Sequence, residues 1–224
     1  MGLYSVRNVF INEDNNFNYL RDVEFEQFAF QEYLKLTEKT FQNDVKEQLN
    51  KIDDLLKSSD LYQIEYAYDY IDHETLVHTH KLYYSSLFVS LYSFLERKLY
   101  AICIEAQKKQ TIKVKDISGD GIFKYQKYLK KVIGIDFSES NTEWTIINRY
   151  NKLRNRIIHS PTNTIEKLNN EGLINEFNRI EFLNIKDEET FIVYEMDDVK
   201  LLKEFMKVIH DFLRKIYFVK AQHK

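Results

Sequence analysis

Apolar side chains recur every three or four positions along most of this chain, the spacing that places them on one face of an α-helix. In residues 17–57 the apolar positions are Leu34, Phe41, Val45, Leu49, Ile52 and Leu56. In residues 74–109 they are Leu87, Phe88, Leu91, Tyr92, Leu95, Leu99 and Ile102. After Asp197 and Asp198, whose carboxylates suit a helix N-terminus, they are Val199, Leu202, Phe205, Met206, Ile209, Phe212, Leu213 and Ile216. The pattern predicts a long helix in each of these segments.

Shorter segments carry signals of their own. The stretch ISGDG at residues 117–121 predicts a turn, and residues 122–133 predict a short basic amphipathic helix. Residues 60–72 are rich in aromatic side chains and are read as a short helix. Ser140 and Glu143 have capping-box spacing, so we expect a helix from there to about His159, closed by Pro161. Residues 179–185 and 190–196 flank the polar KDEE, which predicts a β-hairpin at about 180–195.

The composition agrees with a helical bundle. Five glycines and one proline in 224 residues leave few helix breakers. Hydrophobic residues make up 44% of the chain, enough to bury a substantial core. We therefore expect a mainly α fold with one small hairpin before the C-terminal helix. The expected organisation is a single domain over residues 1–224, with residues 1–60 as a helical extension packed on the core.

The cysteine content and the lengths of the apolar stretches bear on the localisation of the protein. The only cysteine, Cys103, lies in the apolar run LYAICIEA, which favours a buried and inert thiol. No apolar stretch is long enough to span a bilayer. The first residues, MGLYSVRNVF, lack the apolar core of a signal peptide. These features predict a cytoplasmic protein that does not bind a membrane.

Charge is unevenly distributed along the sequence. The net charge of −3 argues against a protein that coats nucleic acid without specificity. Residues 12–60 contain twelve acidic and six basic side chains, whereas residues 124–156 contain eight basic and three acidic ones. The basic side chains of the second segment are Lys124, Lys127, Lys130, Lys131, Arg149, Lys152, Arg154 and Arg156. Such a run is either a solvated helix face or a surface that binds phosphates.

The segment KLRNRIIHSP, residues 152–161, contains the most informative polar side chains. Projected as a helix, residues 141–159 place a polar stripe along one side. That stripe consists of Asn148, Lys152, Asn155 and His159. Arg154 lies roughly 140° away from His159, on the apolar side of the helix. A permanently charged arginine there must reach solvent or find an anion, and Glu96 lies on the inward stripe of the helix expected at 74–109. We therefore expect an Arg154–Glu96 ion pair.

His159 ends the same predicted helix, where the helix dipole favours a charged imidazolium. A histidine that exchanges a proton near neutral pH suits general acid–base catalysis. Taken alone, a histidine in this position is also typical of a helix cap. The neighbouring Arg154 and Asn155 favour the catalytic interpretation.

Two further clusters have plain explanations. His73, Glu74, His78 and His80 invite a metal site, but their spacing on a helix sends them to different faces, which favours scattered surface histidines. The tyrosines of residues 62–70 could stack on nucleic-acid bases, but the carboxylates beside them would repel phosphates. We expect these tyrosines to pack in the core and between helices. No metal or cofactor site is predicted.

Arg154, Asn155 and His159 form the pattern R-N-x-x-x-H, which resembles the R-x4-H signature of the HEPN superfamily. The resemblance covers roughly residues 74–219 in helical architecture and only these residues in detail. HEPN proteins are helical bundles, and many are metal-independent endoribonucleases of toxin–antitoxin, abortive-infection and antiviral defence systems. The resemblance implies a bacterial endoribonuclease that needs no cofactor and leaves 2′,3′-cyclic phosphate ends.

The resemblance also assigns roles to residues. His159 would be the acid–base group, Arg154 would stabilise phosphate charge, and Asn155 would orient the histidine or the RNA. Supporting residues would be Glu96, Lys152 and Asn148, and RNA would bind along Lys124, Lys127, Lys130, Lys131, Arg149 and Arg156. The family further implies a homodimer with the site at its interface, and an antitoxin or defence partner protein. The alternative is a non-catalytic HEPN-like subunit that binds RNA or a nucleotide, or acts as a scaffold.

Overall fold

The computed structural model describes residues 13–72, 75–138, 140–160 and 162–218, with side chains for 24–68, 79–138, 140–160 and 162–216. The long helices are α2 (Glu13–Leu56), α4 (Thr75–Ala106), α6 (Asn141–His159) and α8 (Lys200–Phe218). The shorter ones are α3 (Leu61–Asp72), α5 (Gly121–Tyr128) and α7 (Glu171–Phe177). The mainly helical fold class that the apolar periodicity predicts is therefore confirmed.

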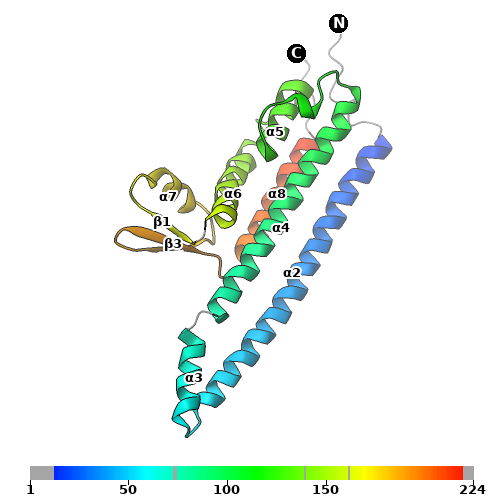
Figure 1. The fold of residues 1–224 in the computed structure, drawn as a ribbon. Coiled ribbons are helices and arrows are strands. Elements are labelled where there is room, and N and C mark those ends of the chain that lie inside the picture. Colours follow the sequence, from blue (N-terminus) through cyan, green and yellow to red (C-terminus); the bar gives the residue numbers. More distant parts are fainter. Residues whose placement is uncertain (1–12, 73–74, 139, 161, 219–224) are drawn as a thin grey trace.

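Helix α4 runs through the middle of the molecule and contacts most of the other helices (Figure 1). Helices α6 and α8 pack against α4, and the long α2 runs antiparallel to α4 and contacts both α4 and α8. Helix α3 folds back on the far end of α2, beyond the part that α8 covers (Figure 1). The small sheet and α7 project sideways from the end of α6.

The core lies where α4, α6 and α8 meet. Phe88 of α4, Tyr150 of α6 and Phe205 of α8 are buried and pack ring against ring, with centroids 4.3–5.9 Å apart. Trp144 of α6 stacks on Phe212 of α8 at 5.5 Å. These contacts explain why the apolar stripes of three helices far apart in sequence face one another, since each stripe is removed from water largely by the other two.

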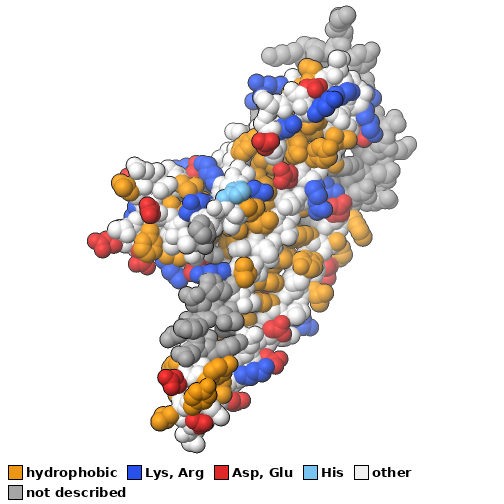
Figure 2. Space-filling model, in the orientation of Figure 1, with side chains coloured by type: hydrophobic (Ala, Val, Ile, Leu, Met, Phe, Trp, Pro, Cys, Tyr) orange, Lys and Arg blue, Asp and Glu red, His pale blue; other side chains and the backbone are white. Residues whose placement is uncertain are grey.

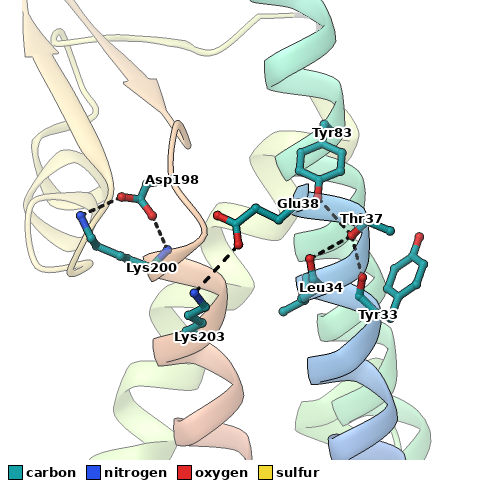
Figure 3. Close-up of polar contacts among 8 residues, drawn as sticks. All are labelled: Tyr33, Leu34, Thr37, Glu38, Tyr83, Asp198, Lys200 and Lys203. Atoms are coloured by element: carbon teal, nitrogen blue, oxygen red, sulfur yellow. Dashed lines mark hydrogen bonds and ion pairs between the residues drawn. The ribbon is translucent and has the colours of Figure 1, made fainter. Parts of the chain in front are cut away.

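Helix α2 is attached along a narrow line. Leu34, Phe41 and Ile52 are its buried apolar side chains, whereas Leu49, on the same predicted stripe, is 50% exposed. Polar contacts reinforce the line (Figure 3): the Tyr83 hydroxyl of α4 lies 3.1 Å from Thr37 Oγ1. On the other side, Glu38 and Lys203 of α8 form an ion pair at 4.0 Å. Helix α2 thus joins α4 and α8 through few groups.

Of the capping contacts predicted at the helix N-termini, those of α8 are found and those of α6 are not. Helix α8 begins as expected, because Asp198 Oδ1 accepts a hydrogen bond from the Lys200 amide at 2.8 Å. The capping box expected at the start of α6 is wrong. The Ser140 hydroxyl donates to the Phe137 carbonyl at 3.3 Å, and the Glu143 carboxylate pairs with Lys215 of α8 at 2.7 Å. Both side chains of the expected box therefore have other partners, although the helix starts where the spacing predicts.

The sheet is larger than the sequence predicts. Strands β2 (Asn184–Asp187) and β3 (Phe191–Glu195) form a hairpin within the expected range, but the expected first strand at 179–185 is wrong, because β2 begins only at Asn184 and includes Lys186 and Asp187 of the expected turn. A third strand, β1 (Thr164–Glu166), pairs antiparallel with the other edge of β3, which gives the order β1-β3-β2. Neither β1 nor α7 was predicted, because each is too short to show a clear period in sequence. Strand β1 directly follows the end of α6 and connects the sheet to the polar residues there.

Burial agrees with the prediction for Cys103 but not for the tyrosines of α3. Cys103 is fully buried, as expected, and burial raises the pKa of its thiol to about 12. The expectation that the tyrosines of α3 pack in the core is wrong for Tyr62, Tyr66 and Tyr68, which are all more than half exposed. Figure 2 shows hydrophobic side chains on the surface at the α3 end of the molecule. Among the described helices, none is long and apolar enough to cross a membrane.

Candidate functional site

The candidate site lies on α6, the helix that holds the R-N-x-x-x-H residues. This helix buries Trp144, Ile147, Tyr150 and Leu153 against α4 and α8. The opposite side leaves Lys152, Asn155 and His159 exposed, as the helical projection predicts. Asn148, at the start of that polar stripe, is half-buried, and its side-chain oxygen is buried without a hydrogen-bond partner among the described residues. The buried side fixes the direction in which the polar stripe points.

Arg154 turns away from the polar stripe and toward α4. Its guanidinium carbon lies 5.7 Å from the centre of the Tyr92 ring, within the range of a cation–π contact. Nη1 donates a hydrogen bond to Oδ1 of the neighbouring Asn155 at 3.1 Å. Nε is buried and has no hydrogen-bond partner among the described residues. Arg154 is therefore held in place on two sides, and only one of its five N–H donors has an acceptor among the described residues.

The predicted Arg154–Glu96 ion pair is not formed between these two described side chains. The Tyr92 ring, one helical turn before Glu96 on α4, takes the position beside Arg154 instead. Glu96 is half-buried and turns toward the start of α5. There its Oε1 lies 3.1 Å from the point that a Cβ on Gly121 would occupy. Gly121 has a φ of +54°, so a side chain there would be strained as well as crowded.

Tyr92 is the residue that links the two helices at the site. Its hydroxyl donates a hydrogen bond to Asn151 Oδ1 at 2.6 Å, one turn before Arg154 and Asn155 on α6. Burial raises the pKa of Tyr92, and the negative charge of Glu96 raises it further, while the positive charge of Arg154 acts in the opposite direction. The hydroxyl therefore stays protonated near neutral pH, which it must do to donate to Asn151.

Tyr92 and Asn151 were not assigned to the site from the sequence. Tyr92 belongs to the apolar stripe of α4, and nothing in its spacing separates it from a core aromatic. Asn151 lies next to the predicted polar stripe but outside it. Their role depends on the crossing of α4 and α6, which periodicity within one helix does not reveal.

His159 is the last residue of α6 and is exposed to solvent. Its side chain makes no hydrogen bond or ion pair with any residue that the structure describes. The backbone there is closed by a bond from the Ser160 amide to the Arg156 carbonyl at 2.9 Å. The imidazole does not cap the helix and is open to a ligand.

Three of the predicted supporting and RNA-binding residues have structural partners. Arg149 Nε and Lys152 Nζ both contact the carboxylate of Glu176 on α7, at 3.1 Å and 3.2 Å. Hydrogen bonds from Lys152 and Arg149, together with their charges, lower the pKa of Glu176. Arg156 Nη2 donates to the Thr164 carbonyl of β1 at 2.6 Å. These side chains fasten α7 and β1 to α6, and the single carboxylate of Glu176 offsets one of their three positive charges.

The predicted basic residues of α5 and of the turn after it differ in exposure and in hydrogen bonding. Lys127 Nζ donates to Ser118 Oγ at 2.7 Å. Lys130 and Lys131 lie in the π-helical turn η3 (Leu129–Ile133) and are exposed, and neither side chain forms a hydrogen bond or ion pair with a described residue, although the charge of Lys130 helps to lower the pKa of Asp136. Lys124 is half-buried and lines a surface hollow with Tyr100 and Tyr125. Only part of the predicted basic surface is therefore free to bind an anion.

The histidines considered for a metal site divide in the structure. His73, Glu74 and the side chain of His78 lie outside the described residues. His80 is half-buried and packs against Phe41 and Tyr84, with ring centroids 4.8 Å and 5.7 Å away, so it is a packing residue and not a surface one. Among the described side chains, no three His, Cys, Asp or Glu residues are arranged to hold a metal ion.

No protein family, curated protein or solved structure matches this chain. The resemblance to HEPN proteins therefore depends on the residues at the end of α6 and on the mainly helical architecture. The end of α6 offers a fixed guanidinium with unused N–H donors, an amide side chain, and an exposed imidazole one turn later. Those groups can bind an oxyanion and exchange a proton.

Proposed function

We propose that this protein is a HEPN-like endoribonuclease that cleaves RNA without a metal ion. The observation that most supports the proposal is the state of Arg154. A buried guanidinium Nε without an acceptor is unusual, because buried donors are nearly always paired, although Arg156 Nε is in the same state. The terminal nitrogens of Arg154 have unused N–H groups as well, and a planar guanidinium is well suited to binding phosphate through such groups.

The proposed reaction is attack of a ribose 2′-oxygen on the adjacent phosphorus. The 2′-hydroxyl proton passes to a base, the bond from phosphorus to the 5′-oxygen breaks, and the departing 5′-oxygen takes a proton from an acid. The products are a 2′,3′-cyclic phosphate and a 5′-hydroxyl. In this scheme Arg154 stabilises the charge on the phosphorane, and Asn155, which accepts a hydrogen bond from Arg154, keeps the guanidinium in position.

His159 would exchange the proton. Its side chain is exposed and forms no hydrogen bond or ion pair with the described residues. One chain supplies a single motif histidine, whereas the reaction needs both a base and an acid. We therefore propose a homodimer in which two copies of the site share one cleft, so that one histidine takes the proton and the other gives it. Action as a bacterial toxin or in antiviral defence, with an antitoxin or partner protein, is part of the same proposal.

Ribonuclease assays in the presence of EDTA test the proposal. The wild-type chain is incubated with tRNA, rRNA and mRNA, and the new ends are identified by mass spectrometry. We expect cyclic phosphate ends, and a loss of about 100-fold or more in His159→Ala, since general acid–base groups contribute that much. His210→Ala is the matched control, because His210 is also on a helix but lies on α8 next to Asp211. A folded, dimeric wild type that cleaves none of the three RNA classes would disprove the proposal.

A second candidate function is supported by the partners of the basic residues. Arg149, Lys152 and Arg156 hold α7 and β1 in place, and Arg154 packs on Tyr92, so the motif region also has a structural role. This favours a non-catalytic HEPN-like subunit that binds RNA or a nucleotide. In that case His159→Ala would leave binding and dimerisation intact, and neither protein would cleave RNA.

A further inference from the structure

A hollow of about 570 Å³ lies between the end of α4, the turns η1 (Gln107–Lys109) and η2 (Val114–Asp116), and α5. Its volume is within the range of sites that bind small molecules. It is separate from the end of α6, because none of the residues that line it belongs to that helix. Its lining divides into an apolar part and a basic part.

The apolar part contains two tyrosines. Tyr100 of α4 and Tyr125 of α5 have ring centroids 5.6 Å apart and planes inclined by 49°, so the rings do not stack on each other. Tyr100 is 47% exposed, which leaves much of its ring open toward the hollow. Ile104 and the buried Val114 complete the apolar surface. A flat aromatic ligand can stack on such a surface.

The basic part contains three lysines, and only two are free. Lys113 Nζ donates to the carbonyls of Gln107 and Gln110 at 2.9 Å and 2.7 Å, so this ammonium group holds the turn together. Lys115 and Lys124 form no side-chain hydrogen bond or ion pair with the described residues. No carboxylate is among the lining residues. Two ammonium groups without a hydrogen-bonded or ion-paired partner among the described residues therefore lie in the hollow together with a half-exposed aromatic ring.

We propose that this hollow binds a nucleotide, with the base against Tyr100 and a phosphate between Lys115 and Lys124. A simple anion would leave the tyrosines unused, and an uncharged aromatic molecule would leave the lysines unpaired. A nucleotide uses both parts, whether it is free or is one unit of a single strand. The inference goes beyond the proposed cleavage, since no residue of the α6 motif takes part and Lys124 is the one residue that it shares with the predicted RNA-binding set.

Isothermal titration calorimetry on the full chain tests the inference. The probes are AMP, adenosine, inorganic phosphate and a short single-stranded 2′-deoxy oligonucleotide, which lacks the hydroxyl that cleavage requires. We expect AMP or the oligonucleotide to bind at least about tenfold more tightly than adenosine or phosphate, because stacking and charge act together. Binding of AMP identifies a site for a free nucleotide, and binding of the oligonucleotide alone identifies a site for one unit of a strand.

Paired variants locate the binding. Lys115→Gln/Lys124→Gln and Tyr100→Leu should each weaken it about tenfold. The control Lys39→Gln/Lys46→Gln removes the same charge from exposed positions on α2 and should change affinity by less than about twofold. If the double variant is unstable in circular dichroism, Lys115→Gln alone replaces it, since Lys115 is exposed. Absence of binding, equal losses in variant and control, or phosphate binding as tight as AMP binding would each overturn the inference.

Discussion

The bundle (α4, α6 and α8) and the arm (α2 and α3) are built from similar helices, but their apolar side chains have very different surroundings. In the bundle, Leu95, Leu153 and Phe205 are completely buried. In the arm, Phe28 is 58% exposed and Leu61 is 80% exposed. The difference arises because each bundle helix is covered by two others, whereas α2 touches the bundle along one line (Figure 1). An apolar helical stripe therefore predicts a helix but not whether the rest of the chain covers it.

The largest difference in stability between the two regions is expected when one phenylalanine of each is replaced by alanine. Phe205→Ala leaves a cavity among Phe88, Tyr92 and Tyr150, and we expect it to lower the free energy of unfolding by about 3–5 kcal/mol. Phe28→Ala removes an exposed ring and should cost less than about 0.5 kcal/mol. Urea denaturation followed by circular dichroism measures both. Similar losses in the two variants would mean that the arm is covered in solution.

A smaller difference is expected between two tyrosine hydroxyls. Tyr92→Phe removes the 2.6 Å bond to Asn151 inside the bundle and leaves that amide without its donor, so we expect a loss of about 1–2 kcal/mol. Tyr83→Phe removes the 3.1 Å bond to Thr37 at the line between arm and bundle, where water can replace it, and should cost less than about 1 kcal/mol. The same denaturation experiment compares them. Equal costs would contradict the distinction between the two regions.

The smallest difference concerns two carboxylates that join elements. Glu176 pairs with both Arg149 and Lys152, whereas Glu38 reaches Lys203 only at 4.0 Å. Because Glu176 and its partners are partly exposed, Glu176→Gln should cost only about 0.5–1 kcal/mol, and Glu38→Gln should have no measurable effect. Both are measured by denaturation at neutral pH.

The cost of Glu176→Gln should depend on pH. The pKa of folded Glu176 is lowered from its ordinary value of 4.5, so its charge stabilises the fold fully above that pH. The stabilisation is lost as the pH falls through the lower folded pKa. Wild type and Glu176→Gln should therefore become equally stable in acid. A cost that persists there would mean that the ion pairs are not its cause.

Much of the fold could be predicted from the sequence because its long helices have strong apolar periods. The helix expected at residues 74–109 is α4 with the short turn η1 after it, and the helix expected to end at His159 does so. Strand β1 was missed because three residues have no readable period, and it exists through pairing with β3, distant in sequence. Local pattern defines a helix, whereas a short edge strand depends on tertiary contacts.

The candidate site was predicted less completely. The projection of α6 correctly turned Arg154 toward α4, but it could not reveal that the Tyr92 ring fills the space where Glu96 was expected. It also could not reveal that Glu176 forms ion pairs with Arg149 and Lys152, since α7 itself was not predicted. In both cases the sequence of α6 shows which way its side chains point. It does not show which side chain they meet, because that depends on the position of a second element.

The buried thiol of Cys103 gives the protein a built-in reporter of opening. It lies within the bundle, 3.7 Å from the Tyr125 carbonyl, and its raised pKa keeps it as the unreactive thiol. Since it is the only cysteine, any modification by a thiol reagent must take place there. Separation of α4 from α5 is expected to expose it, because the Tyr125 carbonyl belongs to α5. The rate at which a thiol reagent reacts with Cys103 would therefore report how often the helices beside the tyrosine-lined hollow separate. The measurement needs no substitution in the protein.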